Sequence, residues 1–218
     1  LATRTWWECR AVDGADLMLE NIIKKYKIDV VYDIGAHHGN FTKRYQRLLP
    51  QTIFHQFEAS PNKNGSGNWH KVVLSDKDDN TVLFYYDGGT GDTYYRETDK
   101  FLKSKYKTIE LKTKRLDTYV EENNLPLPDL IKIDVQGAEL DILKGCDDII
   151  NHCKLIHCEI PAIDIEFNKG SPTQKEYLDF FNSHGFIHKV KEKDHKRDGK
   201  LIIQHDYIFS KEELWVIG

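Results

Sequence analysis

The sequence predicts a three-layer α/β fold, in which helices cover both faces of a mostly parallel β-sheet. Short apolar, β-branched runs alternate with amphipathic segments through most of the 218 residues. Such alternation is typical of parallel strands joined by right-handed crossover helices. The last two apolar runs are separated by a polar loop alone, and a parallel return would need a longer connection. We therefore expect an open sheet with an antiparallel strand at its end.

Each element has its own local signal. Apolar residues spaced among charges predict a helix over 15–26, Pro50 stops one over 40–49, and Gly185 closes one over 173–185. A fourth helix, 139–150, follows an apolar strand that begins near residue 128. The other strands are expected at 28–35, 52–60, 70–76, 81–86, 108–117, 154–160, 186–191 and 201–210. The charged segment 191–200 is interpreted as the solvated tip of the final hairpin.

The composition fits one globular domain and excludes several classes of protein. The net charge of −4 disfavours general nucleic-acid binding, which relies on an excess of Lys and Arg. No apolar run approaches the ~18–20 residues of a membrane span, and the N-terminal residues lack the apolar stretch of a signal peptide. The chain begins with Leu1 rather than Met, so we expect a trimmed or partial chain. We divide it into an N-terminal helical extension, 1–27, and one domain, 28–218.

The cysteines are too sparse for a disulfide framework, which is typical of small secreted domains. We interpret them as free thiols in a reducing cytoplasm: Cys9, Cys146, Cys153 and Cys158. The neighbouring His152, Cys153, His157 and Cys158 suggest a zinc site, but their spacing fits no common finger. The strand expected at 154–160 also sends His157 and Cys158 to opposite faces. We therefore expect no metal and buried structural roles for this segment.

The turn after the first strand favours a cationic cofactor without phosphate. Gly35 and Gly39 let the backbone turn sharply and approach a ligand, and the helix beginning near Asn40 directs free N–H groups to the same place. The spacing is not the G-x-G-x-x-G of dinucleotide binders. Asp33, just before the turn, would repel a pyrophosphate and attract a cation. S-adenosylmethionine, with its ammonium and sulfonium, meets this requirement.

Acidic residues end the next two strands as well. Glu58 lies 25 residues after Asp33, close to the spacing of about 20 at which a carboxylate binds ribose hydroxyls in nucleoside-binding α/β folds. Asp76 ends the third strand and is placed to accept a hydrogen bond from an adenine amino group. Each acid alone is also explained as a turn or helix cap. Three at successive strand ends favour a nucleoside pocket.

The segment DLIKIDVQGAELDILKG carries the most specific pattern in the chain. Lys132 and Asp134 share one strand face, Gly137 opens the turn, and Glu139 lies in the first turn of the following helix. A charged residue in an apolar strand is costly to bury unless it is paired. Lys132 is therefore either a structural partner of an acid or part of the site. Asp134, at the strand end, is expected at the mouth of the pocket.

Five segments together resemble the FkbM-type S-adenosylmethionine-dependent methyltransferases and occur in that family's order: VVYDIGAHHGNFT, FEAS, VVLSD, KRLDTYV and LIKIDVQGAELDILKG. The resemblance runs from about Asp29 to Phe209. It implies a Rossmann-like class I methyltransferase fold, with a seven-stranded, mostly parallel sheet whose last strand is antiparallel. It also implies that the cofactor's methionine part, ribose and adenine are bound, in that order, by Asp33, Gly35, Ala36 and Gly39, by Glu58, and by Asp76. We add His37, Ala59 and Asp134 to this site.

The sequence departs from the family in three places. Gln136 stands where members often carry Glu, and His37 and His38 stand where smaller or amide residues are common. The stretch 60–69, SPNKNGSGNW, is too short and too rich in glycine for the helix expected there. Either this side of the adenine pocket is open or remodelled, or residues are missing from the chain.

The resemblance implies O-methylation of a hydroxyl on a sugar, a glycan or a secondary metabolite. A hydroxyl acceptor benefits from a general base, for which Asp134 and Glu159 are favoured and His37 is a third candidate. In the polar loop 88–101, Tyr94 and Tyr95 either stack on a sugar ring or pack locally.

Two rival functions remain at this point: a methyltransferase acting on protein or nucleic acid, and a catalytically degenerate nucleoside-binding domain. The net negative charge weighs against a methyltransferase that acts on nucleic acid or protein. The acidic residues at three strand ends weigh against a degenerate domain. The oligomeric state is not readable, and Trp6 and Trp7 either cap the core or form an interface.

Overall fold

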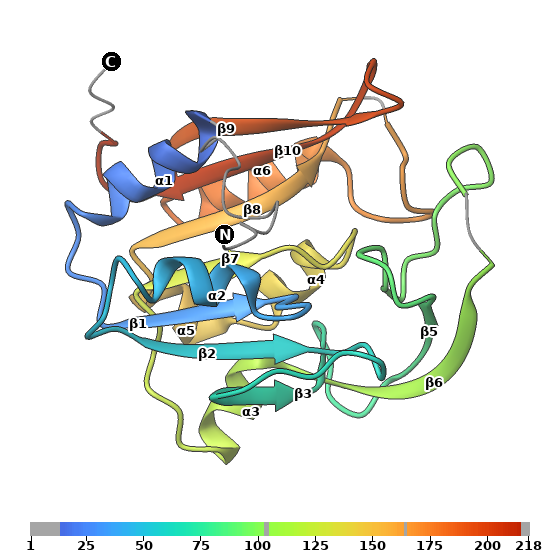
Figure 1. Ribbon diagram of the computed structural model, residues 1–218, viewed down its shortest axis with the longest axis horizontal. Coiled ribbons are helices and arrows are strands. Elements are labelled where there is room, and N and C mark those ends of the chain that lie inside the picture. Colours follow the sequence, from blue (N-terminus) through green and yellow to red (C-terminus); the bar gives the residue numbers. More distant parts are fainter. Residues whose placement is uncertain (1–13, 103–104, 164, 215–218) are drawn as a thin grey trace, which may run out of the picture.

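The computed structural model describes residues 14–102, 105–163 and 165–214, so Cys9, Trp6 and Trp7 lie outside the described residues. A seven-stranded sheet runs through the molecule in the order β3-β2-β1-β7-β8-β10-β9 (Figure 1). The strands are β3 (Asn68–Lys71), β2 (Ile53–Glu58), β1 (Val30–Ile34), β7 (Leu130–Ile133), β8 (Leu155–Pro161), β10 (Leu201–Ser210) and β9 (His188–Arg197). Among them, β10 alone runs in the opposite direction to the other strands. The predicted fold class is confirmed.

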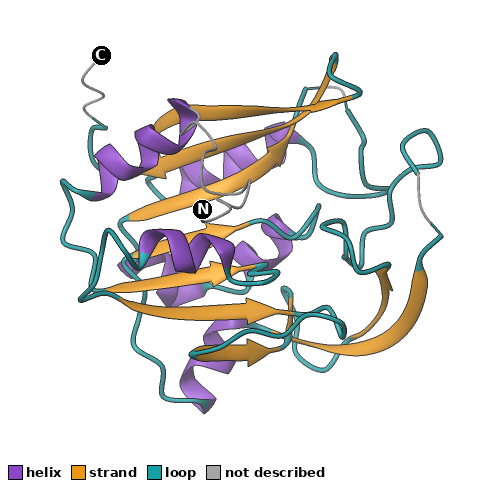
Figure 2. Cartoon of the chain, viewed as in Figure 1, coloured by secondary structure: helices purple, strands orange, loops and turns teal. Residues whose placement is uncertain are grey.

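Helices cover both faces of the sheet (Figure 2). One face is packed by α1 (Gly14–Ile23) and α2 (Asn40–Tyr45), the other by α3 (Leu116–Glu122), α4 (Glu139–Lys144), α5 (Asp147–His152) and α6 (Gln174–Ser183). Side chains alternate between the two cores along each strand, so Tyr32 of β1 packs on one side and Val31 on the other. Among the described residues, none of the helices is both long enough and apolar enough to cross a bilayer.

The α1 helix is part of this core, because Leu19, Ile22 and Ile23 are at most 3% exposed and pack with β1 and β2. The division of the chain at residue 27 stays a prediction. The helix expected over 139–150 is two helices, α4 and α5, broken at Gly145. A Cβ at Gly145 would lie 2.3 Å from the carbonyl oxygen of Ser75, so this close approach requires glycine.

The expected third strand over 70–76 is two strands in different sheets. The chain pairs with β2 as β3, leaves the sheet at Val72, and then forms β4 (Val73–Leu74). In a smaller sheet, β4 pairs with β6 (Lys107–Lys114), which also pairs with β5 (Thr81–Tyr86). β3 is the edge strand of the main sheet and has no partner on its outer side. After Val72 the chain turns away from this edge, and β4 pairs with β6 instead. The break moves Asp76 away from the end of the main sheet.

Residues 59–67 join β2 to β3 by turns and without a helix, as the short, glycine-rich sequence led us to expect. Two parallel neighbours are joined here by fewer residues than the dozen or so of a usual crossover. This connection carries a buried lysine, Lys63, toward the carboxyl ends of the strands.

A stacked pair of histidines fastens β3 to β2. His55 Nδ1 lies 3.0 Å from His70 Nε2, and His70 Nδ1 lies 3.3 Å from the Tyr119 hydroxyl. Burial lowers the pKa of both imidazoles from its ordinary value of 6.5. The unfolded chain therefore takes up these protons at a higher pH than the folded chain.

This pair predicts a loss of stability in mild acid. The contribution is complete above the unfolded pKa of about 6.5 and is lost as the pH falls toward the lower folded values. Denaturant unfolding of wild type and His70→Gln should therefore show a smaller pH dependence in the variant between about pH 7.5 and about pH 5.5. The exposed control His152→Gln should keep the wild-type dependence. An equal dependence in His70→Gln and wild type would contradict the assignment.

Candidate functional site

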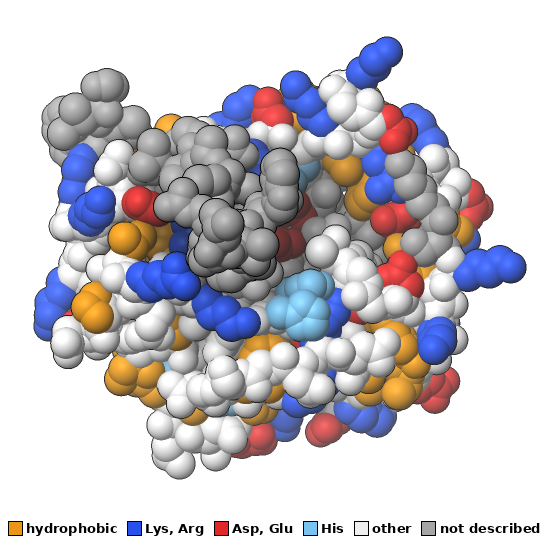
Figure 3. Space-filling view, viewed as in Figure 1, with side chains coloured by type: hydrophobic (Ala, Val, Ile, Leu, Met, Phe, Trp, Pro, Cys, Tyr) orange, Lys and Arg blue, Asp and Glu red, His pale blue; other side chains and the backbone are white. Residues whose placement is uncertain are grey.

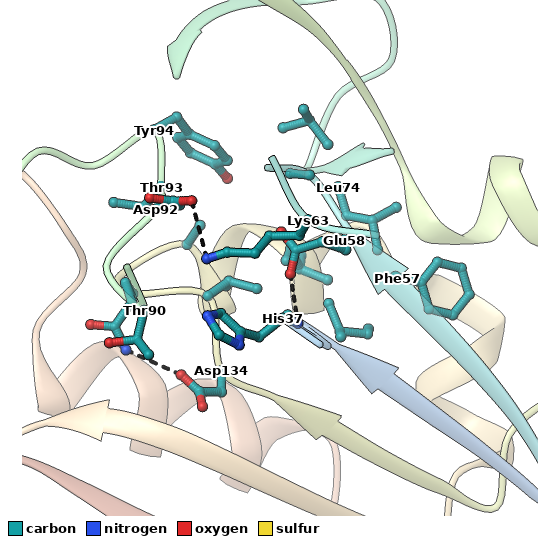
Figure 4. Close-up of a pocket in the computed structure, with 18 of the residues that line it drawn as sticks. His37, Phe57, Glu58, Lys63, Leu74, Thr90, Asp92, Thr93, Tyr94 and Asp134 are labelled. Atoms are coloured by element: carbon teal, nitrogen blue, oxygen red, sulfur yellow. Dashed lines mark hydrogen bonds and ion pairs between the residues drawn. The ribbon is translucent and has the colours of Figure 1, made fainter. Parts of the chain in front are cut away.

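A cavity of about 310 Å³ opens at the carboxyl ends of β1, β2 and β7 (Figure 4). This is where ligands bind in open α/β sheets, at the point where strand order reverses. Its wall is built by the ends of these strands, by the β3–β4 segment, by the loop after β5 and by the start of α4. The residues that the argument uses are Gly35, His37, Glu58, Ala59, Lys63, Leu74, Asp92, Tyr94, Asp134, Gln136, Ile142, Glu159 and His195.

The glycine turn brings β1 and β7 into close contact below the cavity. Gly35 has φ +75°, and a Cβ there would lie 1.9 Å from the carbonyl oxygen of Asp134. No side chain fits this approach, and few tolerate this φ. Gly39 precedes α2 with φ +70°, where a Cβ would lie 2.3 Å from Gln56 Oε1. Both glycines are thus required by the backbone, but Gly35 alone borders the cavity.

Glu58 points into the cavity from the end of β2 and is 8% exposed. Its two oxygens accept backbone N–H groups, one from His37 and one from Ser60, each at 2.7 Å. Figure 4 shows the contact with His37 as a dashed line. Burial raises the pKa of Glu58, although the two N–H donors oppose the shift. The carboxylate is held in place while lone pairs remain for a ligand.

Asp33 does not border the cavity, and the cation that it faces belongs to the protein. Its side chain is fully buried, accepts a hydrogen bond from Thr42 at 2.8 Å, and lies 3.5 Å from Lys132 Nζ. The same ammonium lies 3.6 Å from Asp134 and donates to the Gly35 carbonyl at 3.1 Å. Lys132 is therefore the structural partner of two acids, which settles the alternative that the sequence left open.

Two carboxylates meet at the cavity mouth and are bridged by one amide. Gln136 Nε2 donates to Asp134 Oδ1 at 3.1 Å and to Glu159 Oε2 at 2.8 Å. Desolvation opposes ionisation of Asp134, but attraction to Lys132 outweighs it and lowers the pKa of this carboxyl. Glu159 is 5% exposed, and burial together with the neighbouring carboxylates raises its pKa well above the ordinary value. The two acids thus differ in their readiness to hold a proton.

His195 is a site residue that the sequence reading missed. The segment 191–200 was expected to be a solvated loop, but β9 continues to Arg197 and its inner side chains face the site. His195 Nε2 lies 2.8 Å from Asp206 and 3.5 Å from Glu159. The hydrogen bond to Asp206 raises its pKa. The sequence has no apolar–polar alternation to mark this strand, because nearly every residue of the segment is charged.

Lys63 is the second residue that was missed. It is 2% exposed, donates to the carbonyls of Gly88 and Gly89, and lies 3.6 Å from Asp92. Ser60 also donates to Asp92, at 2.6 Å. In Figure 4 Lys63 reaches across the cavity to Asp92 from the opposite wall. The β2–β3 connection is thereby fastened to the loop after β5. No local pattern marks a lysine in a glycine-rich turn as buried.

The structure brings together only part of the predicted set. Gly35, His37, Glu58, Ala59, Asp134 and Glu159 border the cavity, whereas Asp33, Ala36, Gly39 and Asp76 do not. Asp76 lies beyond β4, where its backbone carbonyl accepts from Arg115. The hydroxyls of Tyr94 and Tyr95 both donate to Asp141, at 3.2 and 2.8 Å, and their rings lie 5.1 Å apart. The two tyrosines therefore pack locally, and Tyr94 alone of the two borders the cavity.

The cysteine segment has the predicted orientation. Cys158 packs in the core on the α4 side, while His157 lies 6.3 Å from the Phe41 ring on the opposite side. Cys146, Cys153 and Cys158 are buried free thiols.

Comparisons with known proteins identify this chain as similar to methyltransferases. Residues 33–188 match the sequence profile of the methyltransferase FkbM domain. The chain is 27% identical over 176 residues to the 2-O-methyltransferase NoeI of Sinorhizobium fredii, covering 71% of each protein. It is 28% identical over 221 residues to Methyltransferase 1 of Beauveria bassiana, covering 83% of this chain and 86% of that protein. Identity to the hexuronic acid methyltransferase AglP of Haloferax volcanii is 23% over 165 residues, covering 72% and 66%.

Among solved structures, the precorrin-6y C5,15-methyltransferase of Geobacter metallireducens superposes with a TM-score of 0.50 and 12% identity, covering 96% of this chain and 94% of that one. At this identity the likeness concerns the fold alone, which is Rossmann-like.

The buried ammonium of Lys132 generates a prediction about stability. Lys132→Met leaves Asp33 as an uncompensated buried carboxylate, and we expect a loss of about 3–5 kcal/mol in the free energy of unfolding. Adding Asp33→Asn should restore part of the loss, because it removes the unpaired charge. Lys27→Met, which breaks the exposed pair with Asp29, is the matched control and should change little. A loss below about 1 kcal/mol in Lys132→Met would refute the role given to this residue.

The amide bridge generates a second prediction. Gln136→Glu replaces a donor shared by two carboxylates with a third carboxylate, so we expect about 1–3 kcal/mol lower stability at neutral pH. The pKa of the new acid is raised, so the destabilisation should grow as the pH rises and shrink below about pH 5. Chemical denaturation over this range measures the effect, with the exposed Gln46→Glu as control. A pH-independent difference would show that the three side chains do not interact.

Proposed function

The chain belongs to the family of methyltransferases with an FkbM domain, and we propose that it methylates a hydroxyl group of a sugar or glycan, with S-adenosylmethionine as the methyl donor. Membership makes it a methyltransferase. The proposed acceptor is supported by the relatives' names, since one is a 2-O-methyltransferase and another a hexuronic acid methyltransferase. The cytoplasm is the compartment that its buried free thiols favour.

The observation that carries this proposal is the charge of the cavity wall. Glu58, Asp92, Asp134 and Glu159 all border the cavity, against Lys63 and two histidines. A dinucleotide would bring its pyrophosphate against these carboxylates, whereas a cationic nucleoside without phosphate is attracted to them. The residues present therefore fit S-adenosylmethionine, which supplies an electrophilic methyl group on a sulfonium when it is bound.

Particular residues suit particular parts of this cofactor. Glu58 has the buried, oriented carboxylate that ribose hydroxyls require, and the backbone N–H of His37 holds it in place. The apolar side chains of Leu74 and Ile142 provide a surface for a base. Asp134 and Glu159 lie at the cavity mouth, where the amide of Gln136 bridges them. Desolvation lowers the pKa of His37, which favours the neutral imidazole.

Alignment and exclusion of water are the main contributions that the protein makes to a displacement at carbon. The glycine turn, Glu58 and the fastened loop after β5 provide that alignment. An acceptor hydroxyl that attacks the methyl carbon also loses a proton, so a titratable group at the cavity mouth has to receive it.

Titration calorimetry with S-adenosylhomocysteine tests the cofactor assignment. We expect wild type to bind S-adenosylhomocysteine and not NAD. Glu58→Gln should weaken binding at least tenfold, because a charge-assisted contact contributes about 1.5–3 kcal/mol. Thermal unfolding of each variant checks that it is folded.

Asp76→Asn is the control, since this residue lies outside the cavity wall. The affinity of this variant for S-adenosylhomocysteine should stay within about threefold of wild type, which is a change of less than about 1 kcal/mol in binding free energy. Tight NAD binding, or unchanged affinity in a folded Glu58→Gln, would overturn the proposal.

A further inference from the structure

A second cavity of about 530 Å³ adjoins the first. The two share five wall residues: Gly89, Thr90, Gln136, Glu159 and His195. A group bound in the second cavity therefore reaches the first past Glu159 and His195. In Figure 3 acidic side chains are visible in a hollow beside a group of histidine side chains on this face of the molecule.

The wall of the second cavity has the chemistry that recognises a ring carrying many hydroxyl groups. Carboxylates of Asp87 and Glu97 and the amide of Gln204 offer acceptors and donors, and the rings of Tyr106 and Phe167 offer apolar faces. Arg197 adds a cation above the Phe167 ring, with its Nε buried and without a hydrogen-bond partner among the described residues. A buried donor of this kind is costly unless a ligand satisfies it.

His195 stands at the junction of the cavities, with a carboxylate fixed behind it. Nε2 carries the contacts to both acids, 2.8 Å to Asp206 on β10 and 3.5 Å to Glu159 on β8. With Nε2 donating to Asp206, Nδ1 is the nitrogen left to accept a proton. Asp134 at the end of β7 and Lys193 on β9 also act on this imidazole, in opposite directions.

The other candidate bases are less suited to the task. Asp134 is held by Lys132 and Gln136, and its lowered pKa makes it a weak proton acceptor. Glu159 is buried with a raised pKa and accepts two amide donors, from Gln136 and Gln204. The pKa of His195 is instead raised from a value near neutrality by its bond to Asp206, which suits proton transfer at physiological pH.

We propose that the second cavity binds the acceptor sugar and that His195, oriented by Asp206, accepts the proton of the hydroxyl that is methylated. This inference rests on the proposed function. The acceptor oxygen forms a bond to the methyl carbon as the carbon–sulfur bond of the donor breaks. Sulfur keeps that electron pair and becomes a neutral thioether, while the hydroxyl proton moves to His195. His195 is thus a catalytic residue and Asp206 a positioning residue.

His195→Gln and His205→Gln form a matched pair for the test. His205 also pairs with an aspartate, Asp194 at 2.7 Å, but does not border either cavity. The probes are p-nitrophenyl β-D-glucuronide and p-nitrophenyl β-D-glucoside. Calorimetry measures their binding to the protein loaded with S-adenosylhomocysteine. A methyl-transfer assay with S-adenosylmethionine measures turnover. Arg197→Gln tests the second cavity by binding alone.

We expect His195→Gln to lower kcat about 10²–10⁴-fold and to abolish the acidic limb of the pH profile, with a far smaller effect on S-adenosylhomocysteine affinity. His205→Gln should match wild type. Asp206→Asn should keep acceptor affinity and shift the limb to lower pH, because His195 loses the partner that raises its pKa. Arg197→Gln should weaken binding of at least one glycoside without affecting S-adenosylhomocysteine.

Turnover in His195→Gln within threefold of wild type would overturn the inference while the proposed function stands. The same holds if neither glycoside binds to or reacts with wild type that binds S-adenosylhomocysteine. Loss of S-adenosylhomocysteine binding in His195→Gln equal to its loss of turnover would also overturn it. Wild type that does not bind S-adenosylhomocysteine contradicts the proposed function and the inference together.

Discussion

The geometry of the site depends on one buried ammonium group. Lys132 Nζ lies within 3.6 Å of a carboxylate on each of two strands and donates to the carbonyl of Gly35. It thereby joins the carboxyl ends of β1 and β7 at the point where Gly35 passes against the backbone of Asp134. Without this cation, the carboxylates of Asp33 and Asp134 would repel each other, and the fully buried Asp33 would be an unpaired charge. Lys132 therefore both neutralises the two acids and stabilises the close contact between the backbones of Gly35 and Asp134.

The acids at the cavity mouth illustrate how one environment separates similar groups. Asp134 is close to the cation and its pKa is lowered, whereas Glu159 is buried among carboxylates and its pKa is raised. Gln136, with φ +59°, donates to both and keeps a third negative charge out of the cluster. Such separation of pKa values at neighbouring groups is typical of sites that move protons.

The β2–β3 side of the molecule shows how the cavity is closed without the expected helix. Lys63 and Ser60, from a connection of turns, both reach Asp92 on the loop after β5. This side of the cavity is therefore closed by two loops that are held together through the Asp92 carboxylate. The same loop after β5 also contributes Gly89 and Thr90 to both cavities, so it forms part of the boundary between them.

The amino-acid pattern was sufficient for the fold class, for the family and for the position of Glu58, Asp134 and Glu159 at the carboxyl ends of the strands. These features follow from local sequence, because an apolar run ends where its strand ends and parallel strands end at the same edge. The position of Asp76 could not be predicted from the sequence, because it depends on the chain leaving the main sheet after β3 so that β4 pairs with β6. His195 and Lys63 were missed for the same reason. Their positions are set by strand register and loop packing between segments far apart in the chain, and a charged residue carries no local mark of whether such packing will bury it.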